Sequence, residues 1–306
     1  MIAAYYYICY MTIEAFSLSL QPKTKLRGIL EIITAAAEFD DIPIRHHEDI
    51  VLGKLFESLP VKVENPDFND PHLKANLLIQ AHFSRMKLSV ELERDQKSIL
   101  SRVIRLLQAC VDVISSNGWL TPALSAMELS QMAVQALWDR DSPLMQIPHM
   151  DSAILKALEL ADVKHIFDLS EMDGDKRLKI LNMDEERLGA VAAFVNAYPS
   201  VDVEFKAPED VDSGQAFSVH VSLESEAELN VIAPHYPFPK EVGWWLVIGD
   251  TSKNLHAIKR VQFANQHELD LTLTLEQPGK HDLVLYLMCD TYMGVDQEFE
   301  FSVRCK

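Results

Sequence analysis

The spacing of the apolar residues changes once along this chain, close to residue 200. Upstream, apolar residues recur every three to four positions, as at Leu73, Leu77 and Leu78, which share one face of a helix. Downstream they alternate with polar residues, as in the run 269–275, and alternation is the period of a half-buried strand. Two periods in separate blocks predict a multidomain α+β chain, because each block must bury its own apolar face.

Residues 1–148 are predicted to form a helical bundle. The stretch DPHLKANLLIQAHFSRMKL begins with Asp70 and Pro71, residue types favoured at the N-cap and the first position of a helix. A second helix is expected over 98–116, where an apolar stripe is followed by an Asn-Gly pair that suits a C-cap. The connections between these helices are short, which favours antiparallel neighbours in a compact bundle.

Residues 149–200 predict a group of shorter helices joined by tight turns. Their expected ranges are 151–160, 163–169, 174–181 and 184–197. Such an arrangement is similar to a helix-hairpin-helix domain, so the helical part of the chain is predicted to divide in two.

Residues 201–306 predict an immunoglobulin- or fibronectin-III-like β-sandwich. Strand-like runs recur there, separated by Gly, Pro and Asn turns. Trp244 and Trp245 open one of these runs, and adjacent strand residues point to opposite faces. Only one of the two indoles is therefore expected in the core, and the other is a candidate for a partner-binding surface.

The formal net charge of −18 is spread unevenly. Acids outnumber Lys and Arg by 17 to 14 over residues 1–140, by 11 to 6 over 141–200 and by 18 to 8 over 201–306, giving nets of −3, −5 and −10. A surface that tracks a phosphate backbone is normally basic. Nucleic acid is therefore disfavoured as the main partner, and any RNA contact is expected to be weak and to avoid the acidic C-terminal part.

The sequence indicates no zinc site, no disulfide framework and no membrane segment. The four cysteines, Cys9, Cys110, Cys289 and Cys305, lie in apolar stretches without CxxC spacing, which suits reduced, mostly buried thiols of an intracellular protein. The opening MIAAYYYICYMTIEAFSLSL contains Glu14 and has no basic n-region, so it fails as a signal peptide and as a membrane span. Its apolar residues are expected to pack against protein.

The segment RHHED, residues 45–49, combines an arginine, two histidines and two acids. Metal ligands on a helix come from one face, at i and i+3 or i+4, whereas these neighbours fan out around the helix. Glu48 and Asp49 are expected in the first turn of an amphipathic helix, where acids favour the positive end of the dipole. The segment is therefore interpreted as structural.

Signatures of an enzyme are missing from the sequence. No GxSxG, GxGxxG or GxxxxGK[ST] motif occurs. His82 and His149 have no carboxylate or cysteine placed by the sequence to form a triad, and SEMDGD, residues 170–175, lacks the glutamate that would complete a calcium loop. No catalytic residue, metal ligand or cofactor site is assigned.

Three basic residues are the candidates for RNA contact. Arg102 and Arg105 are i, i+3 neighbours on the helix expected at 98–116, although a solvated or salt-bridged face is the plainer interpretation. Lys164 lies in LADVKH, the turn of the hairpin candidate, where Asp162 stands in place of a glycine and would repel a phosphate. That hairpin is interpreted as a structural spacer.

Several of these stretches together resemble a Sec-63 homology unit. In chain order they are YYYICYMTIEAF, IPIRHHED, NDPHLKANLLIQAHFSR, LLQACVDVISSNGWL, GWWLVIGD and DTYMGVDQEFEFSV, and the resemblance covers essentially the whole sequence. The chain looks most like the C-terminal such unit of the spliceosomal U5 snRNP two-cassette RNA helicases (Ski-two-like, DExH-box). The helicase subunit of the activating signal cointegrator complex is a similar relative with which it could be confused, but QACVDVISSNGWL and DPHLKANLLIQAHFSR resemble the spliceosomal helicases more.

The resemblance implies a helical bundle, a helix-hairpin-helix domain and an immunoglobulin-like sandwich, the three regions expected above. It also implies a nuclear protein of pre-mRNA splicing, a piece of a helicase whose ATP and Mg²⁺ sites lie in motor domains that this sequence lacks. In active relatives a bundle helix lies along the unwound strand, and chain order places that helix here at 98–116. Asp112 opposes Arg102 and Arg105 on it, a departure that weakens such a contact.

Two functions are open from the sequence. The first is a non-catalytic Sec-63 unit that acts as a protein-interaction scaffold and a modulator of the helicase in spliceosome activation. Its partners would be splicing-factor proteins and the helicase's own N-terminal cassette. The alternative is a ratchet or accessory module that contacts single-stranded RNA directly through Arg102, Arg105 and Lys164.

Overall fold

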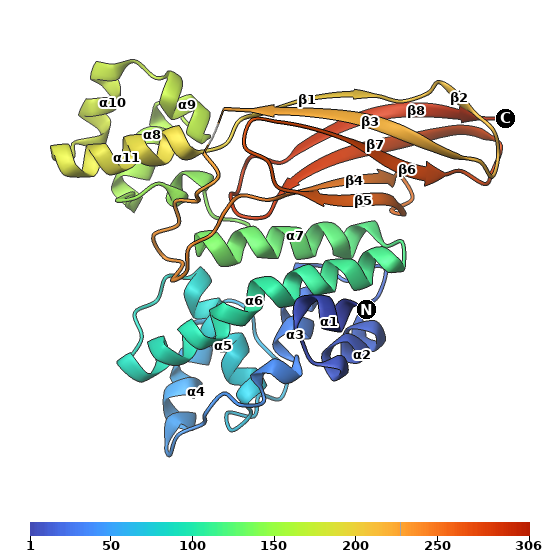
Figure 1. Ribbon diagram of the computed structural model, residues 1–306. Coiled ribbons are helices and arrows are strands. Elements are labelled where there is room, and N and C mark those ends of the chain that lie inside the picture. Colours follow the sequence, from blue (N-terminus) through green and yellow to red (C-terminus); the bar gives the residue numbers. More distant parts are fainter. Residues whose placement is uncertain (227) are drawn as a thin grey trace.

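Helices fill the first two thirds of the chain and strands the last third, as Figure 1 shows for the computed structural model, which describes residues 1–226 and 228–306. Over these residues the helices are α1 (Ile2–Tyr6), α2 (Tyr10–Ser19), α3 (Leu26–Thr34), α4 (Glu48–Ser58), α5 (Pro71–Phe83), α6 (Val90–Ser116), α7 (Leu120–Gln135), α8 (Ser152–Leu160), α9 (Ile166–Glu171), α10 (Gly174–Leu181) and α11 (Glu185–Ala197). The strands are β1 (Val201–Lys206), β2 (Asp210–Val211), β3 (Ala216–Ser225), β4 (Trp244–Asp250), β5 (Leu255–Val261), β6 (Gln266–Thr274), β7 (Gly279–Cys289) and β8 (Gln297–Cys305). The predicted α+β class is confirmed.

The bundle helices begin where their capping residues stand. The Asp70 carboxylate accepts a backbone N–H of the first turn of α5 at 2.9 Å, and Pro71 is the first residue of that helix. α6 begins at Val90 rather than near 98, because the Ser89 side chain caps it there. The early turns of α6 are rich in charged residues, which obscured their helical period in the sequence.

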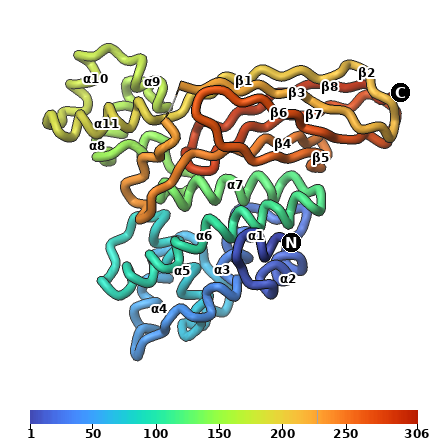
Figure 2. The backbone as a smooth tube through the Cα atoms, in the orientation of Figure 1, coloured from blue at the N-terminus to red at the C-terminus, as the bar shows by residue number. Residues whose placement is uncertain are grey.

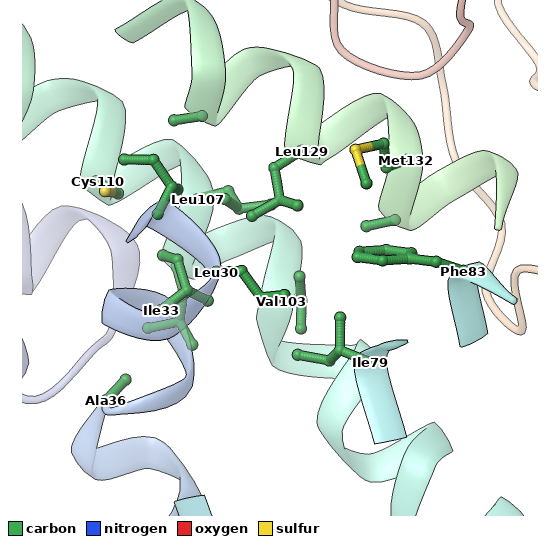
Figure 3. Packing of buried hydrophobic residues seen from close by; sticks show 14 of the residues in the cluster. Leu30, Ile33, Ala36, Ile79, Phe83, Val103, Leu107, Cys110, Leu129 and Met132 are labelled. Atoms are coloured by element: carbon green, nitrogen blue, oxygen red, sulfur yellow. The ribbon is translucent and has the colours of Figure 1, made fainter. Parts of the chain in front are cut away.

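Four helices supply most of the part of the bundle core that Figure 3 shows. The residues labelled there from α3, α5, α6 and α7 are each no more than 2% exposed: Leu30, Ile33, Ile79, Phe83, Val103, Leu107, Cys110, Leu129 and Met132. Fully burying one large apolar side chain stabilises a fold by about 1.5–3 kcal/mol. This cluster therefore accounts for much of what holds the N-terminal helices together.

The N-terminal stretch packs against this bundle with part of its apolar residues, as predicted, whereas Tyr5, Tyr7 and Leu18 are exposed. Phe16 and Leu20 are buried, and the Tyr6 hydroxyl donates to the Asp112 carboxylate on α6 at 2.9 Å. Across residues 1–226 and 228–306, no helix is both long and apolar enough to span a bilayer.

The strands form two sheets that face each other across an apolar core. One has the order β1-β3-β6 and the other β2-β8-β7-β4-β5, and the pairs are antiparallel except for β2 with β8. Leu271 on β6 pairs with Val219 on β3, and both are fully buried. The alternation predicted over 269–275 is confirmed, since its four leucines are each no more than 9% exposed.

α7 lies between the five-stranded sheet and α6, covering the outer face of that sheet (Figure 1). Side chains of β4 and β7 belong to the same apolar core as α6 and α7: Trp245, Val247, Tyr286 and Met288. Gly249 approaches Leu120 so closely that a Cβ there would lie 2.5 Å from the leucine side chain. The five-stranded sheet and the helical bundle thus pack against each other through one shared apolar core.

The short helices α8 to α11 gather at one end of the sandwich, with α10 on the outer side (Figures 1 and 2). Their buried residues belong to the same apolar core as the sandwich rather than to that of the bundle: Leu158, Ile166, Leu169, Leu181, Val191 and Phe194. α10 contributes a single fully buried residue, Leu181. This region therefore leaves much more of its side-chain surface open than the bundle does.

Candidate functional site

The RHHED segment supplies half of a buried ion network. Lys74 of α5 is fully buried, and its Nζ lies 2.8 Å from a Glu48 carboxylate oxygen and 2.6 Å from Asp95 Oδ2. Arg45 Nη1 lies 2.9 Å from Glu48 Oε1 and 2.5 Å from the same Asp95 oxygen. The four charges balance, so this cluster joins α4, α5 and α6 without leaving a buried charge unpaired.

The pairing decides the protonation state of the two acids. Burial by itself raises the pKa of Glu48, but hydrogen bonds from Lys74 and Arg45 outweigh it and hold that pKa below its usual range. Burial also raises the pKa of Asp95, but the hydrogen bonds from Arg45 and Lys74 outweigh it, so that this pKa is lowered. Both carboxylates are therefore ionised at neutral pH and act as ion-pair partners, not as general acids.

The two histidines of the segment take no part in the network. His46 and His47 are exposed, and His47 precedes α4 with a φ of 61°. Among the described residues no group of three or more His, Cys, Asp or Glu could hold a metal ion. The structural interpretation of RHHED is confirmed for Arg45 and Glu48.

Arg102 is engaged within the chain. Its guanidinium forms an ion pair with Asp41, at 2.5 and 3.1 Å, and also donates to the backbone carbonyl of Glu38. The Arg102 hydrogen bonds lower the pKa of Asp41. The side chain is 21% exposed, so it ties α6 to the segment that precedes α4 rather than extending into solvent.

Arg105 is half-buried on the same helix. Its Nε is buried, and no hydrogen-bond partner reaches that atom within residues 1–226 and 228–306. Because Arg102 is paired with Asp41 and Arg105 is half-buried, α6 does not present two free guanidiniums side by side. No hydrogen bond or ion pair among the described residues joins either arginine to Lys164.

The hairpin turn between α8 and α9 has its backbone donors occupied. One oxygen of the Asp168 carboxylate accepts the backbone N–H groups of Lys164 and His165, at 2.9 and 2.8 Å. Those hydrogen bonds lower the pKa of Asp168. Asp162 adopts the left-handed conformation, with a φ of 59°, and pairs with Lys164 Nζ at 2.9 Å. A carboxylate thus sits where a hairpin that binds nucleic acid would receive a phosphate.

The expectation of one exposed tryptophan is wrong. Trp244 and Trp245 are each 2% exposed, although they point to opposite faces of β4 as predicted. Trp244 packs in the core of the sandwich, and Trp245 packs against the helical bundle, where Arg260 lies over its ring. The outer face of this sheet is covered by α7, which the sequence pattern of β4 did not reveal.

Several other residues flagged by the sequence have structural roles, whereas His149 is exposed. His82 is buried, its Nε2 lies 2.7 Å from the Ala133 carbonyl, and burial lowers its pKa to about 4. In SEMDGD, the Asp173 side chain caps α10 by accepting the Lys176 N–H. The four cysteines are all free, and all but Cys9 are buried.

A polar seam between α7 and the sandwich was missed by the sequence reasoning. Buried side chains of α7 donate to backbone carbonyls at and just after the end of β7: Ser130 to Asp290 at 2.9 Å, Gln131 to Cys289 at 2.8 Å and Gln135 to Thr291 at 3.0 Å. The helix has a single charged residue, Glu128, and most of its positions are buried. A helix without a charged face is expected to be buried on all sides, and the near absence of charged residues in α7 was visible in the sequence.

Asp296 lies at the same seam. Its Oδ1 accepts the Cys289 N–H at 2.7 Å, and both carboxylate oxygens lie within 3.0 Å of Gln131 Nε2. Burial raises the pKa of Asp296 to about 6, outweighing these hydrogen bonds, and no cation contributes to offset it. The seam therefore contains a carboxyl that is only partly ionised just below neutral pH.

Comparison with known proteins points to one family. The sequence model described as the Sec63 Brl domain matches residues 1–302. The U5 small nuclear ribonucleoprotein 200 kDa helicase of Homo sapiens is 50% identical over 311 residues, which cover 100% of this chain and 15% of that protein. The pre-mRNA-splicing factor brr2 of Schizosaccharomyces pombe is 44% identical, over 99% of this chain and 14% of its own length.

A relative named for a different complex is similar over almost the same span. The activating signal cointegrator 1 complex subunit 3-like protein of Dictyostelium discoideum is 41% identical, over 98% of this chain and 14% of its own length. Among solved structures, the CARDB domain of a Pyrococcus furiosus protein covers 36% of this chain and is itself covered to 94%, with a TM-score of 0.28 and 14% identity. The chain spans about 15% of the length of the curated relatives it matches.

Proposed function

Since the chain belongs to the Sec63 Brl domain family, we propose that it is the Sec63 unit of a nuclear RNA helicase of pre-mRNA splicing and works there as a non-catalytic scaffold. Its partners are splicing-factor proteins and the N-terminal cassette of the same helicase, which it modulates during spliceosome activation. ATP and Mg²⁺ act in motor domains outside these residues. The division into domains at 1–148, 149–200 and 201–306 is part of this proposal.

The observation that carries the scaffold role is the occupied hairpin turn. The backbone N–H groups of Lys164 and His165 already donate to Asp168, so a phosphate would have to displace an intramolecular carboxylate. Asp162 adds a second negative charge beside the same turn. This turn favours a protein-facing role over a grip on RNA.

Two further features support the same role. Arg102 is held by Asp41, and using it for RNA would require breaking that ion pair. The net charge of −18 repels polyanions at long range, whereas protein partners are selected by local complementarity.

The direct test is capture of partners from nuclear extract on the immobilised chain. An unrelated protein of the same size and net charge serves as the control. Splicing proteins retained on this chain and not on the control support the scaffold role. Retention of the same set on both would contradict it, because charge alone would then explain the binding.

The alternative, direct contact with single-stranded RNA, is tested by fluorescence anisotropy at low and near-physiological salt. Arg102→Ala removes the cation, and Asp41→Asn removes its partner while leaving the cation free. The scaffold role predicts weak, salt-sensitive binding that Arg102→Ala leaves unchanged. Binding near or below about 1 μM that persists at physiological salt, falls in Arg102→Ala and rises in Asp41→Asn would favour the RNA-gripping module.

A further inference from the structure

One side of the β-sandwich is open between β1 and β8, the side that lies away from the helical bundle (Figure 1). β8 pairs with β7 along its whole length, but it pairs with β2 only at Arg304 and Cys305. Among residues 1–226 and 228–306, no strand pairs with the outer backbone edge of β8 over residues 298–302. This stretch is therefore a free sheet edge.

The free edge presents regularly spaced backbone donors and acceptors. The N–H group of Arg304 points to this edge, since it donates to the Glu209 carbonyl just before β2, at 2.8 Å. The register between β7 and β8 has no bulge, so the backbone groups of every second residue face the same edge: Glu298, Glu300 and Ser302. A further strand can pair with these groups without disturbing the ladder to β7.

The side chains of β8 that face the core are buried only where β2 pairs with this strand. Val303 and Cys305 are 1% and 3% exposed at that end, whereas Phe299 and Phe301 are half-buried along the free part. The ring of Phe205 on β1 is also half-buried, and its centroid lies 5.9 and 5.5 Å from theirs. A strand added beside β8, in line with β2, would bury more of these three rings.

The outward side chains along the same edge are acidic. Glu298 and Glu300 are exposed, and no ion pair within residues 1–226 and 228–306 involves either of them. They belong to a region, residues 201–306, with a net charge of −10. Opposite charges on neighbouring strands stabilise their pairing, so Lys or Arg on an added strand would favour binding at this edge.

A second copy of this edge is a poor occupant. Pairing β8 with β8 would bring Glu298 and Glu300 close to the same carboxylates of the other copy, and like charges on neighbouring strands are destabilising. Charged side chains on an edge strand are one means by which proteins avoid joining edge to edge. The charge of this edge therefore disfavours self-association and favours a basic strand.

We propose that the free edge of β8, residues 298–302, binds an extended basic segment of a protein partner by β-strand addition. The backbone of the segment pairs with the free N–H and C=O groups of β8. Its alternate apolar side chains pack against Phe299 and Phe301, and the Lys or Arg side chains between them lie beside Glu298 and Glu300. The inference rests on the proposed scaffold function and names the surface and the chemistry of one partner.

The experiment is a selection with displayed peptides of about nine residues, long enough for one strand. Alternate positions are fixed as Val, and the positions between them vary among Lys, Glu and Thr. The library is selected against the intact chain, and enriched peptides are then synthesised and their affinities measured by anisotropy. We expect Lys to be enriched over Glu at the varied positions.

Two changes at one residue show whether the selected peptides pair with β8. Glu300→Pro removes a backbone N–H that faces the free edge and takes no part in the ladder to β7, which is where a strand tolerates proline. Glu300→Gln keeps that N–H and removes only the charge. Affinity should fall about tenfold or more in Glu300→Pro and less in Glu300→Gln.

Charge reversal tests the same edge with the backbone intact. Glu298→Lys combined with Glu300→Lys should weaken the Lys-containing peptides about tenfold or more. Glu224→Lys combined with Glu268→Lys makes the same change of charge at exposed positions of the other sheet and should weaken them much less. This pair of double variants decides the question if Glu300→Pro fails to fold, which circular dichroism would show.

Hydrogen exchange shows where a bound peptide lies. Deuterium uptake by residues 297–303, measured by mass spectrometry, should slow when a selected peptide is added. Uptake by β5, which forms the other edge of the same sheet, should not change. Slowing at β5 alone would place the peptide on the wrong edge and overturn the inference.

Other outcomes would overturn it as well. These are enrichment of Glu, no enrichment, or equal affinities for the wild type and a folded Glu300→Pro variant. Equal weakening in the two double variants would show that long-range charge explains the binding. Dimers of the chain that sedimentation detects and that Glu300→Pro abolishes would assign the edge to a second copy.

The extract capture separates this inference from the scaffold function. If the selection fails while splicing proteins are still retained by the chain and by Glu300→Pro alike, the partner docks elsewhere and the scaffold function stands. If neither the selection nor the capture succeeds, both proposals fall.

Discussion

Two groups of charged side chains in this protein differ in burial and in ion pairing. The network of Arg45, Glu48, Lys74 and Asp95 is largely buried, balanced in charge and joined by contacts of 2.5 to 2.9 Å. The α10 lysines, Lys176 and Lys179, lie at the surface, and no ion pair with an acidic side chain involves them in the described residues.

The difference shows that a dense run of charges in a sequence does not mark a functional surface. RHHED has the more unusual composition, yet its arginine and first acid form ion pairs in the network that joins α4, α5 and α6. The KRLK run of α10 is ordinary in sequence, yet its two lysines are exposed. Buried pairs are expensive to break, and unpaired surface cations cost the fold little to change.

The largest expected effect is in Lys74→Met. Removing the ammonium leaves the Glu48 and Asp95 carboxylates in a buried site with Arg45 as their single cation, which should lower the free energy of unfolding by about 3–5 kcal/mol. Lys176→Met, the matched change on α10, should stay within about 0.5 kcal/mol of the wild type. Urea unfolding followed by circular dichroism measures both, and similar losses in the two variants would break the comparison.

Asp296→Asn tests a partly buried carboxyl whose raised pKa no neighbouring cation offsets. The folded state raises its pKa from the ordinary 3.8 to about 6, so the group favours folding fully below pH 4 and loses that contribution as pH rises through 6. A shift of this size corresponds to about 2–3 kcal/mol, which the wild type should lose between pH 4 and pH 7 and the variant should not.

Unfolding curves at several pH values check the sign. Asp95 supplies the opposite case, because its pKa is lowered in the folded state, so its contribution is present above its ordinary pKa and is lost as pH falls through the lowered value. Asp296→Asn and Asp95→Asn should therefore remove pH dependences of opposite sign. The same sign in both would refute the assigned charge environments.

Arg102→Ala should have an intermediate effect. Its ion pair with Asp41 is partly exposed, with 21% of the arginine and 69% of the aspartate side chain open to solvent. Such a pair is worth about 1 kcal/mol or less, so the unfolding midpoint in urea should fall only slightly. A loss as large as that of Lys74→Met would place Arg102 with the buried network rather than between the two groups.

The smallest expected effect on stability is that of Lys176→Glu combined with Lys179→Glu. Both side chains are exposed, and no ion pair in the described residues is lost, so the free energy of unfolding should change by less than about 0.5 kcal/mol. Thermal unfolding monitored by circular dichroism measures the change. A loss above about 1 kcal/mol would show that α10 needs its cations to fold.

The sequence predicted the elements of the fold well where local chemistry decides them. The capping pair at Asp70 and Pro71 starts α5, and the alternating leucines over 269–275 line the sandwich, because caps and periodicity act within a few residues. The start of α6 was predicted too late, since charged residues near Val90 concealed its period.

The candidate site depended on information that local sequence does not contain. One of Trp244 and Trp245 was expected at the surface because adjacent strand residues point to opposite faces, but α7 covers the outer face from more than a hundred residues away along the chain. A salt-bridged Arg102 was the plainer interpretation, but its partner, Asp41, could not be identified because it lies 61 residues from it in the chain. Neither contact has a signature in the neighbouring residues.

What the sequence determined by itself is therefore the order of helices and strands, the acidic balance and the family resemblance. Only the tertiary structure decided which charged side chains are buried and paired, such as Lys74, and which are exposed, such as Lys176. The physical reason is distance along the chain. Local patterns fix backbone conformation, whereas the availability of a side chain depends on what remote elements place beside it.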